Sequence, residues 1–507
     1  MFIRKKKNKS GAVSVQIIDK SSGYRVFKTV GSSNDADKIS KLVRKAQEIL
    51  HTYNGKQAVL PFETKEEHVL QEFLEQLSNA QIRTIGPELI LGTLFDRLGF
   101  NIVKEDLFRH IVIARLAYPV SKLKTIDYLY RYQGITIEKD YIYRFLDKLN
   151  DDYKDAVERV AFEYSKNVLG TIAVVFYDMT TLYFESEDED DLRKIGFSKD
   201  GKFQNPQIML GLLVGENGYP IGYDIFEGNT FEGHTLLPVI EKMCRKYDVG
   251  KPVIVADAAL LSRENIKYLK DRGYQFILGG RIKNETTELK QKILTKAKGI
   301  ADKDGFDIAR SDGTRLIVTY SAQRYKKDAY NRERGIAKLR QRIKSGRLTK
   351  NSINNRGYNK FLVLGGDISV AINEDKVKEE GVWDGLKGFI TNTDLPIDTV
   401  VTNYRHLWQI EKAFRISKTD LRIRPIYHYR KKRIAAHICV AFVAYTIYKE
   451  LERLLAQRKI TFSPKRAVEL THTMYQLEYQ LSDVVPVKRV TLKMDLEQKE
   501  LFNAIFL

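Results

Sequence analysis

Two short runs of β-branched and aromatic residues, each followed by an aspartate, constrain the fold of this chain most. The runs are Thr171 to Tyr177 (TIAVVFY), before Asp178, and Pro252 to Ala256 (PVIVA), before Asp257. Near-continuous apolar strands of this kind are buried on both faces, which predicts a sheet with helices on either side. We therefore expect an α/β fold in which each aspartate ends a buried strand, at the edge where sites form in open α/β sheets.

The residues around these runs alternate between strand and helix patterns. A turn signal at Gly215 to Gly218 joins two apolar runs and predicts a hairpin. The remaining pattern predicts helices over Leu236 to Arg245 and Arg263 to Arg272, with a strand over Tyr274 to Leu278. A hairpin followed by alternating strands and helices describes a mixed α/β core.

Changes in this pattern divide the chain into five predicted parts. Residues 1–60 form a small α+β unit whose basic arm (Lys5, Lys6, Lys7 and Lys9) either grips phosphates or is a disordered tail. Residues 61–165 are helical and form either a DNA reader or a plain helical bundle. The α/β core comprises residues 166–284 and 385–460, residues 285–384 are an insertion, and residues 461–507 are a C-terminal region.

The insertion combines a predicted hairpin, Phe306 to Ser321, with a strongly basic block, Arg324 to Lys360. The block holds thirteen Lys and Arg residues against Asp328 and Glu333. We expect it to be too polar to form a core, so the insertion should be β-rich and basic. Its charges are dense, so contacts to DNA phosphates are expected rather than base reading. The candidate contacts are Lys338, Arg340, Arg342 and Lys344.

Composition fits a nucleic-acid partner without requiring one. Lys and Arg number 85 against 65 Asp and Glu, a net charge of +20 that suits either a polyanion or a solubilising surface. Cys244 and Cys439 lie far apart, which argues against a disulfide framework or a zinc cluster and fits a reducing cytoplasm. The most apolar helical run, Ile434 to Tyr448, is shorter than a membrane span and predicts a buried core helix.

A third acidic residue, Glu411, lies within the amphipathic segment Tyr404 to Lys418 (YRHLWQIEKAFRISK). Its apolar stripe predicts one helix packed against the sheet. Tyr404, Glu411 and Lys418 are spaced by seven, so they would share a helical face. A solvated salt-bridge face is the alternative interpretation of the same pattern.

Several of these segments together resemble a known family. Phe176 to Glu185 (FYDMTTLYFE), Gly196 to Lys202 (GFSKDGK) and Val255 to Ala258 (VADA) resemble motifs of bacterial insertion-sequence DDE transposases. Tyr404, Glu411 and Lys418 resemble the Tyr-Glu-Lys signature of the insertion-sequence four superfamily, and Arg424 to His428 (RPIYH) resembles its downstream segment. The chain departs from the family pattern at Leu407, where an Arg is usual, and at Ala258, where a Gly is common.

The resemblance implies a ribonuclease H-like catalytic core in which Asp178, Asp257 and Glu411 hold two Mg²⁺ ions, with Mn²⁺ as a substitute. Mg²⁺ prefers carboxylate oxygens, and paired divalent ions suit phosphodiester chemistry. The implied activity is cut-and-paste transposition by hydrolysis and strand transfer. Tyr404, Lys418 and the cluster Arg430, Lys431, Lys432 and Arg433 would contact DNA.

The implied partners are double-stranded DNA, at the transposon-end inverted repeats and at the target, and a second copy of the chain in the end-paired complex. No membrane is expected, and the implied location is the bacterial cytoplasm, at the nucleoid. Two alternatives stay open: a ribonuclease H-like nuclease that cuts without joining, and a domesticated DNA-binding protein without catalysis.

Overall fold

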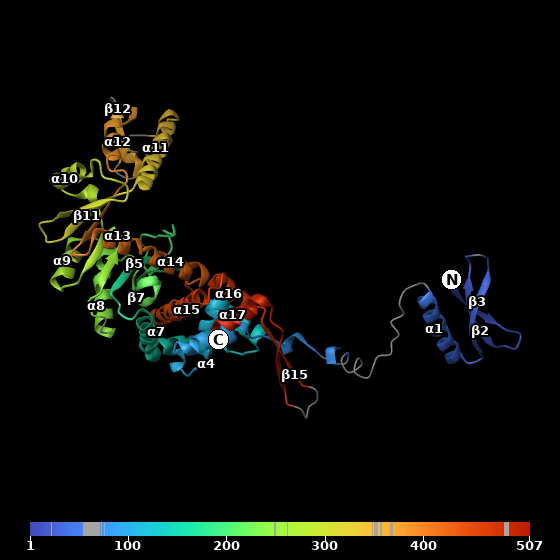
Figure 1. Cartoon of the computed structure of the whole chain (residues 1–507). Helices are drawn as coiled ribbons and strands as arrows, with labels where there is room; N and C mark the ends of the chain where they lie inside the picture. The colour runs from blue at the N-terminus through green and yellow to red at the C-terminus, as the bar shows by residue number, and fades with distance from the viewer. Residues whose placement is uncertain are drawn as a thin grey trace. The chain divides into compact units, whose positions relative to one another are not determined.

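The computed structural model describes residues 1–507 except 22, 54–70, 72, 76, 248–249, 261, 347, 349–352, 355–356, 366–368 and 481–485. The chain forms two compact units, Met1–Ser78 and Asn79–Leu507 (Figure 1). The boundary expected between residues 60 and 61 lies outside the described residues. Each unit is described by itself.

The first unit is a three-stranded antiparallel sheet covered by one helix. Its elements are β1 (Phe2–Lys7), β2 (Val13–Asp19), β3 (Arg25–Ser33) and α1 (Ala36–Tyr53). Val15 and Ile17 of β2 are fully buried with Ala46 of α1. The Asp35 carboxylate accepts a hydrogen bond from the Lys38 amide at 2.9 Å and caps α1. The basic arm is therefore not a disordered tail, because residues 2–7 form a strand paired with β2.

The second unit is organised around an eight-stranded mixed sheet in the order β10-β11-β14-β9-β8-β5-β6-β7. Strands β5, β8 and β9 run parallel, and the other pairs are antiparallel. The hairpin between β6 and β7 turns through Glu216–Gly218 as predicted. The strands are β5 (Val174–Tyr183), β6 (Gln207–Val214), β7 (Pro220–Glu227), β8 (Val253–Ala256), β9 (Phe276–Gly280), β10 (Gly305–Ala309), β11 (Arg315–Tyr320) and β14 (Leu386–Thr391).

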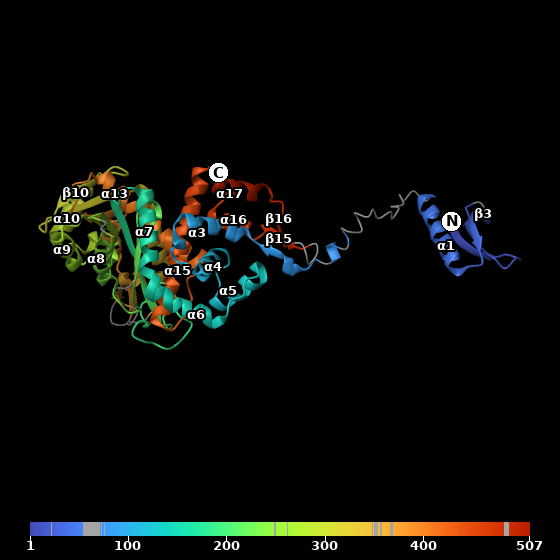
Figure 2. The ribbon, with the colours of Figure 1, turned by 90° about the horizontal axis from the view of Figure 1, so that it is seen from below.

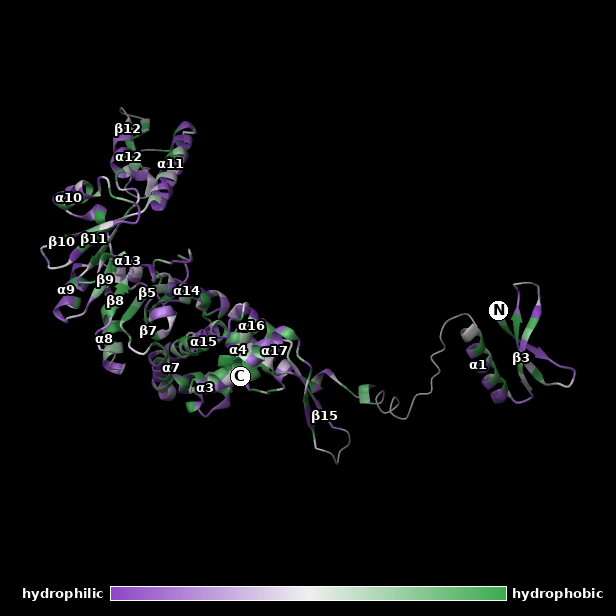
Figure 3. Ribbon diagram, viewed as in Figure 1, coloured by the Kyte–Doolittle hydropathy of each residue, from purple (hydrophilic) through white to green (hydrophobic). Residues whose placement is uncertain are grey.

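Both faces of this sheet are buried, as the apolar runs predict, because successive side chains point to opposite faces. Phe176 and Val255 belong to one core, and Tyr177 and Ala256 to the other. The second core is covered by α8 (Leu236–Tyr247) and α9 (Arg263–Asp271). Figure 3 shows the central strands β8 and β9 as mainly hydrophobic ribbon.

A helical region packs on the first core around the long helix α15 (Lys431–Gln457). Its elements are α3 (Thr93–Arg97), α4 (Asp106–Ala117), α5 (Lys122–Tyr128), α6 (Lys139–Lys148) and α7 (Lys154–Leu169), with the short turns η2 (Glu88–Gly92), η3 (Phe100–Ile102), η4 (Leu129–Gln133) and η5 (Leu149–Tyr153). Helices α3, α4, α6 and α7 contact α15 (Figure 2). Among the described helices, only α15 is long and apolar enough to cross a membrane, and 94 % of that window is buried inside the protein. The predicted core helix is therefore confirmed.

The C-terminal region returns to the start of the same unit. Helices α16 (Pro464–Thr471) and α17 (Leu496–Phe506) pack against α15. Strand β15 (Tyr475–Tyr479) pairs with both β16 (Lys488–Thr491) and β4 (Ile82–Thr84). Residues from the two ends of this unit thus form one small sheet.

The insertion differs from expectation in two respects. Strands β10 and β11 form the predicted hairpin, but they extend the main sheet instead of building a separate region. The basic block begins as α11 (Ala322–Lys344), and its Ile336 and Leu339 form a small core with Phe361 and Leu362. The expectation of no core was wrong because its few apolar residues recur at helical spacing. The other elements are η9 (Ile282–Asn284), α10 (Thr287–Ala297), η11 (Gly357–Phe361), β12 (Leu362–Gly365), β13 (Ser369–Ile372) and α12 (Glu374–Gly381).

Candidate active site

Asp178 lies inside strand β5, not at its end. The parallel pairing with β8 stops at Tyr177 and Ala256, whereas the antiparallel pairing with β6 continues through Asp178 to Tyr183. The strand extends because β6 still provides hydrogen-bond partners for its backbone. The prediction that the strand ends before Asp178 is therefore wrong. The parallel pairing of β5 with β8, however, does end just before Asp178.

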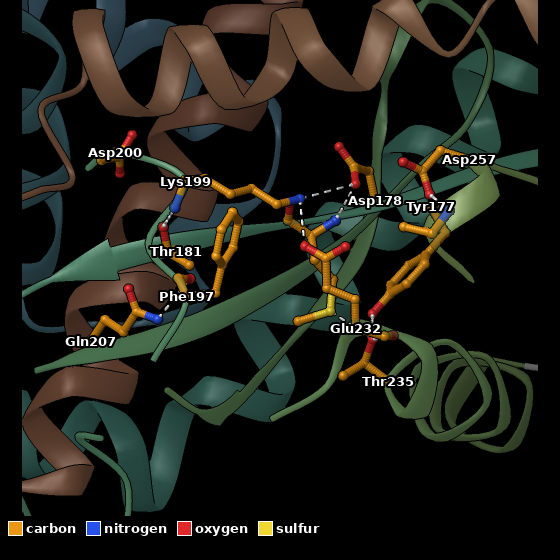
Figure 4. A network of polar contacts seen from close by, with 12 residues as sticks. Tyr177, Asp178, Thr181, Phe197, Lys199, Asp200, Gln207, Glu232, Thr235 and Asp257 are labelled. Atoms are coloured by element: carbon orange, nitrogen blue, oxygen red, sulfur yellow. Dashed lines mark hydrogen bonds and ion pairs between the residues drawn. The ribbon is translucent and has the colours of Figure 1, made fainter. Parts of the chain in front are cut away.

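Asp257 is the first residue after β8, as predicted. The register Tyr177↔Ala256, continued by one residue, brings Asp257 beside Asp178. Side chains alternate along a strand, so these aspartates follow Phe176 and Val255 toward the first core. Figure 4 shows the two carboxylates next to each other. The Oδ1 atom of Asp257 accepts a hydrogen bond from the Ala259 amide at 2.8 Å.

Burial raises the pKa of Asp178 to about 6, and the negative charges of Asp257 and Glu232 add to the rise. The charge of Lys199 opposes it, with the Lys199 Nζ atom 3.8 Å from Asp178 Oδ1. The same amine lies 2.7 Å from a Glu232 carboxylate oxygen and donates to the Met179 carbonyl at 2.6 Å (Figure 4). The aspartate pair is thus a concentration of negative charge with one nearby lysine.

Lys199 and Glu232 were not predicted as site residues. Lys199 lies in the GFSKDGK segment that follows the first-aspartate motif, so its position was a usable signal. Glu232 lies in a short 3-10 turn, η7 (Glu232–His234), and nothing in its local sequence distinguishes it from a surface glutamate. Only the fold brings it to the amine of Lys199.

Glu411 approaches from a helix that the sequence predicted as continuous. The structure has α13 (Ile397–Arg405), then α14 (Trp408–Arg415), then the π-helical turn η12 (Ile416–Asp420). The single helical face expected for the seven-residue spacing is therefore interrupted at His406 and Leu407. Helix α14 contacts β5, and the negative charge of Glu411 acts on both Tyr404 and Lys387.

Tyr404 is buried, only 9 % exposed, beside the acidic residues. Its ring packs edge-on against Phe389 at 4.9 Å, and Lys387 Nζ lies 4.4 Å from the ring centroid. Burial raises the pKa of Tyr404 to about 12, and Asp257, Glu411 and Asp178 contribute to the rise. The charges of all three predicted acidic residues therefore act on this one tyrosine.

Lys418 is held by an aspartate that was not predicted. Its Nζ atom lies 3.2 Å from Asp200, and Arg424 forms an ion pair with the same carboxylate. Burial lowers the pKa of Lys418, Asp200 opposes this effect, and the positive charges of Arg424 and Lys199 reinforce it. Asp200 also belongs to the GFSKDGK segment. That segment therefore connects Lys418 to the aspartate pair.

The other predicted DNA contacts belong to different elements from those that carry the three acidic residues. At the start of α15, Lys432 pairs with Asp151 at 2.6 Å and Arg433 pairs with Asp147 at 2.8 Å. Arg430 and Lys431 are exposed. On α11, the side chains of Lys338, Arg340, Arg342 and Lys344 are all exposed, and Arg340 pairs with Glu374 at 2.8 Å. Three further cations of the basic block, Arg347, Lys350 and Arg356, lie outside the described residues.

The aspartate pair suits a divalent cation by its chemistry. Carboxylate oxygens are the ligands that Mg²⁺ prefers, and a bound cation would offset the burial and the neighbouring negative charges that raise the pKa of Asp178. Within the described ranges, no three His, Cys, Asp or Glu side chains converge closely enough to hold one ion together. The fit therefore rests on Asp178 and Asp257, with Glu411 within electrostatic range of the same tyrosine.

Comparison with known proteins identifies the family. A family model described as "Transposase DDE domain" matches residues 170–447, whereas no curated protein sequence matches the chain. Similar solved structures include a piggyBac transposase synaptic complex with hairpin DNA (8 % identity, 76 % of each chain covered, TM-score 0.38). They also include a Drosophila P element transposase strand transfer complex (11 %, 86 % of this chain and 90 % of that chain, TM-score 0.22).

The Mos1 transposase paired-end complex with left transposon end is also similar (9 % identity, 51 % of this chain and 69 % of that chain, TM-score 0.16). These structural likenesses are weak, so the assignment rests on the family model. The matched residues run from the start of β5 through α14 and well into α15, and they span more than half of the chain. The chain therefore belongs to the DDE transposases.

Proposed function

We propose that this protein is the transposase of an insertion sequence and carries out cut-and-paste transposition by phosphodiester hydrolysis followed by strand transfer. The observation that carries the proposal is the pair Asp178 and Asp257, adjacent at the end of the parallel ladder in a chain of the DDE family. Burial makes the charge of Asp178 costly unless a cation binds there. A pair of that kind has no evident value to the fold alone.

We further propose that the core is ribonuclease H-like. The support is a central strand, β5, with the antiparallel hairpin β6–β7 on one side and the parallel strands β8 and β9 on the other. Helices cover both faces. In this core Asp178 and Asp257 come from neighbouring strands, and Glu411 comes from a helix packed on the same face.

Asp178, Asp257 and Glu411 would hold two Mg²⁺ ions, for which Mn²⁺ could substitute. Bound there, the ions would supply Lewis-acid stabilisation of the charge that develops at phosphorus during attack and departure. The protein's own groups would hold and orient the DNA strand. Lys199 balances the charge of Asp178 and Glu232, Tyr404 packs beside the acidic residues, and Lys418 presents a cation oriented by Asp200.

The family resemblance supports the wider context of the proposal. The substrates would be double-stranded DNA, at the inverted repeats of the transposon ends and at the target. The Tyr-Glu-Lys subgroup of the insertion-sequence four superfamily, a bacterial cytoplasm near the nucleoid, and a homodimer that pairs two ends are parts of the same proposal. The exposed cations of α11 and the start of α15 would contact phosphates.

The test incubates the purified protein with DNA that carries the repeats flanking its coding region, with Mg²⁺, Mn²⁺ or EDTA. A denaturing gel separates nicked, hairpin and joined products. We expect metal-dependent nicking and joining that disappear in Asp178→Asn, Asp257→Asn and Glu411→Gln, while binding of the same DNA persists. Cleavage without joining would favour a nuclease. Metal-independent retention of all activity would refute the assignment.

A further inference from the structure

A cavity of about 640 Å³ lies where the helical region meets the segment that follows the signature lysine. Its walls come from α4, α5 and α6, from residues 422–429 and from α15. The volume is in the range of a small-molecule pocket. The family assignment gives this cavity no role, and the predicted site residues do not line it.

Two cations are buried in the wall of this cavity, and neither has a negative partner among the residues that the structure describes. Arg115 and Lys122 are each 5 % exposed. Arg115 Nη1 reaches only the carbonyl oxygens of Leu421 and Arg422, at 3.4 and 3.3 Å. The side-chain amine of Lys122 has no hydrogen-bond or ion-pair partner in the described part of the chain. Burial lowers the pKa of both groups, to about 10 for Arg115, and the two charges also oppose each other.

The remaining polar wall does not neutralise these charges. His428 and His437 line the cavity, with ring centroids 5.5 Å apart, and burial together with Arg115 and Lys122 lowers the pKa of both. The Nδ1 atom of His437 is buried without a partner among the described residues. The negative charge of Asp147 acts on His428 and opposes the lowering of its pKa. The Asp147 carboxylate, however, already accepts two hydrogen bonds from Arg433.

Unpaired buried cations are costly to a fold, and apolar residues of similar size would be neutral or better. Their presence around a cavity is therefore explained by an anion that enters it. Two adjacent cations and two neutral imidazoles, which donate or accept hydrogen bonds, suit a small doubly charged oxyanion. A diester phosphate carries one charge, whereas a phosphate monoester carries close to two at neutral pH.

The cavity is joined to the candidate active site by charged contacts. Arg424 lines the cavity and forms an ion pair with Asp200, and Asp200 also holds Lys418. Lys199, which precedes Asp200 in the sequence, lies near Asp178. Arg422, in the same wall, has a φ of 44°, a conformation that non-glycine residues adopt at a cost. A strand bound at the aspartate pair can thus have its continuation recognised in the cavity.

We propose that this cavity binds the 5′-phosphate that first-strand hydrolysis leaves on the cleaved DNA strand. The inference rests on the proposed function. In that hydrolysis the water oxygen forms a bond to phosphorus while the bond from phosphorus to O3′ breaks. One proton of the water goes to O3′, and the other is released to solvent. The products are a 3′-hydroxyl and a 5′-phosphate monoester, which carries one more negative charge than the diester.

The depth of the two cations favours a strand end over an intact duplex. A phosphate inside a duplex is flanked by sugars on both sides and would be kept outside a wall in which Arg115 and Lys122 are almost fully covered. A terminal phosphate is attached on one side only and can enter. Tyr143, whose ring lies edge-on to the His428 ring with centroids 6.2 Å apart, gives the cavity an aromatic wall for the attached nucleotide.

The test compares two forms of one fluorescent single-stranded oligonucleotide, with a 5′-phosphate or a 5′-hydroxyl, by anisotropy at fixed salt without divalent metal. We expect the full-length protein to bind the phosphorylated form about tenfold more tightly, the effect of one charge-assisted hydrogen bond. Lys122→Met and Arg115→Met should each remove this preference while leaving affinity for the hydroxyl form unchanged. Lys139→Met, which removes an exposed charge from the same helical region, should keep it.

Melting temperatures verify that each methionine variant is folded, and they should stay level or rise because an apolar side chain replaces an unpaired buried cation. Inorganic phosphate at constant ionic strength should compete with the phosphorylated probe on the wild-type protein. This second measurement tests the site even if a variant fails to fold. Equal binding of both probes by the wild-type protein overturns the proposal.

A third outcome separates the two sources of a phosphate monoester. If inorganic phosphate or a nucleoside 5′-monophosphate raises the melting temperature through Lys122 but the probes bind equally, the cavity takes a free phosphorylated molecule and the DNA-end assignment is refuted. The Asp178→Asn variant should keep the 5′-phosphate preference. A wild-type protein that shows the preference but never cuts DNA would sink the proposed function and leave the cavity's specificity standing.

Discussion

Asp178 has a partly buried carboxylate that lies beside a second carboxylate, Asp257. Burial and the neighbouring Asp257 raise its pKa to about 6, from the usual value of 3.8. The folded protein therefore binds this proton more tightly than the unfolded chain does. Stability is lost as the pH rises from about 4 through about 6, and the loss is complete above that range.

We predict that Asp178→Asn makes the metal-free protein more stable at pH 7.5, by up to about 3 kcal/mol, and that the gain shrinks toward pH 4. The measurement is thermal melting in EDTA at several pH values. Asp147→Asn is the matched control with the opposite sign, since hydrogen bonds from Arg433 lower the pKa of Asp147. A lower melting temperature for Asp178→Asn at pH 7.5 would show that this carboxylate is not a destabilising charge.

Gly279 controls the position of Tyr404. A Cβ atom at residue 279 would lie 2.5 Å from the Tyr404 hydroxyl and 2.9 Å from the Ala258 amide, next to Asp257. We predict that Gly279→Ala lowers the cleavage rate roughly tenfold or more, because overpacking of this kind costs about 1–3 kcal/mol. Adding Tyr404→Phe should restore part of the rate by removing the contacted oxygen.

Gel kinetics of Gly279→Ala, Tyr404→Phe and the double variant provide the comparison, with the Tyr404→Phe single variant as the reference. If the double variant is no faster than Gly279→Ala, the contact with Tyr404 is not what limits the reaction.

Among the secondary-structure elements, α11 presents its charges on either side of a buried stripe. Ile336 and Leu339 face the small core, while Lys338, Arg340, Arg342 and Lys344 remain exposed. Figure 3 shows much of this helix as hydrophilic. A helix anchored on one side and cationic along its flanks is suited to lie along a phosphate backbone.

We predict that changing these four cations to Gln weakens binding to all DNA sequences. The slope of log K against log salt should become shallower by about 0.9 for each DNA phosphate that the variant no longer neutralises. The control changes Lys290, Lys292, Lys296 and Lys298 of the α10 region to Gln, which alters net charge equally. Identical slopes in the α11 variant and the wild-type protein would indicate a solvated face.

The elements differ in how far local sequence determined them. The strands around Asp178 and Asp257 were predictable because short runs rich in β-branched and aromatic residues, such as TIAVVFY, are typical of strands buried on both faces. The interruption between α13 and α14 was not, since Arg405 to Trp408 contains neither Gly nor Pro and tertiary packing decides the geometry there. Asp178 and Asp257 were identifiable from local pattern, and Glu411 mainly from the family resemblance. Glu232 and Asp200 reach Lys199 and Lys418 only through long-range contacts that local sequence does not encode.

At the scale of the whole molecule, the chain consists of two compact units, and each has its own core. We predict that residues 79–507 alone fold with an unchanged melting transition for the main unit and keep metal-dependent nicking, but bind DNA more weakly. The weaker binding would result from the loss of the lysines of β1. The full chain should therefore bind DNA equally weakly when Lys5, Lys6 and Lys7 are changed together to Gln. Calorimetry and DNA titration of both proteins test this, and an unfolded fragment would contradict it.

The joint between the sheet and its outlying helices has a consequence for protein engineering. Tyr320, the last residue of β11, is paired with Leu386, the first of β14, and the Ser321 amide donates to the Gly385 carbonyl at 3.0 Å. Everything between them, including α11 and α12, leaves and re-enters the sheet through this one narrow neck (Figure 1). The excursion is in effect a hairpin loop, so it could be replaced by a two-residue turn or by a foreign domain whose termini lie close together. One basic module could thus be exchanged for another at this position without rebuilding the main sheet.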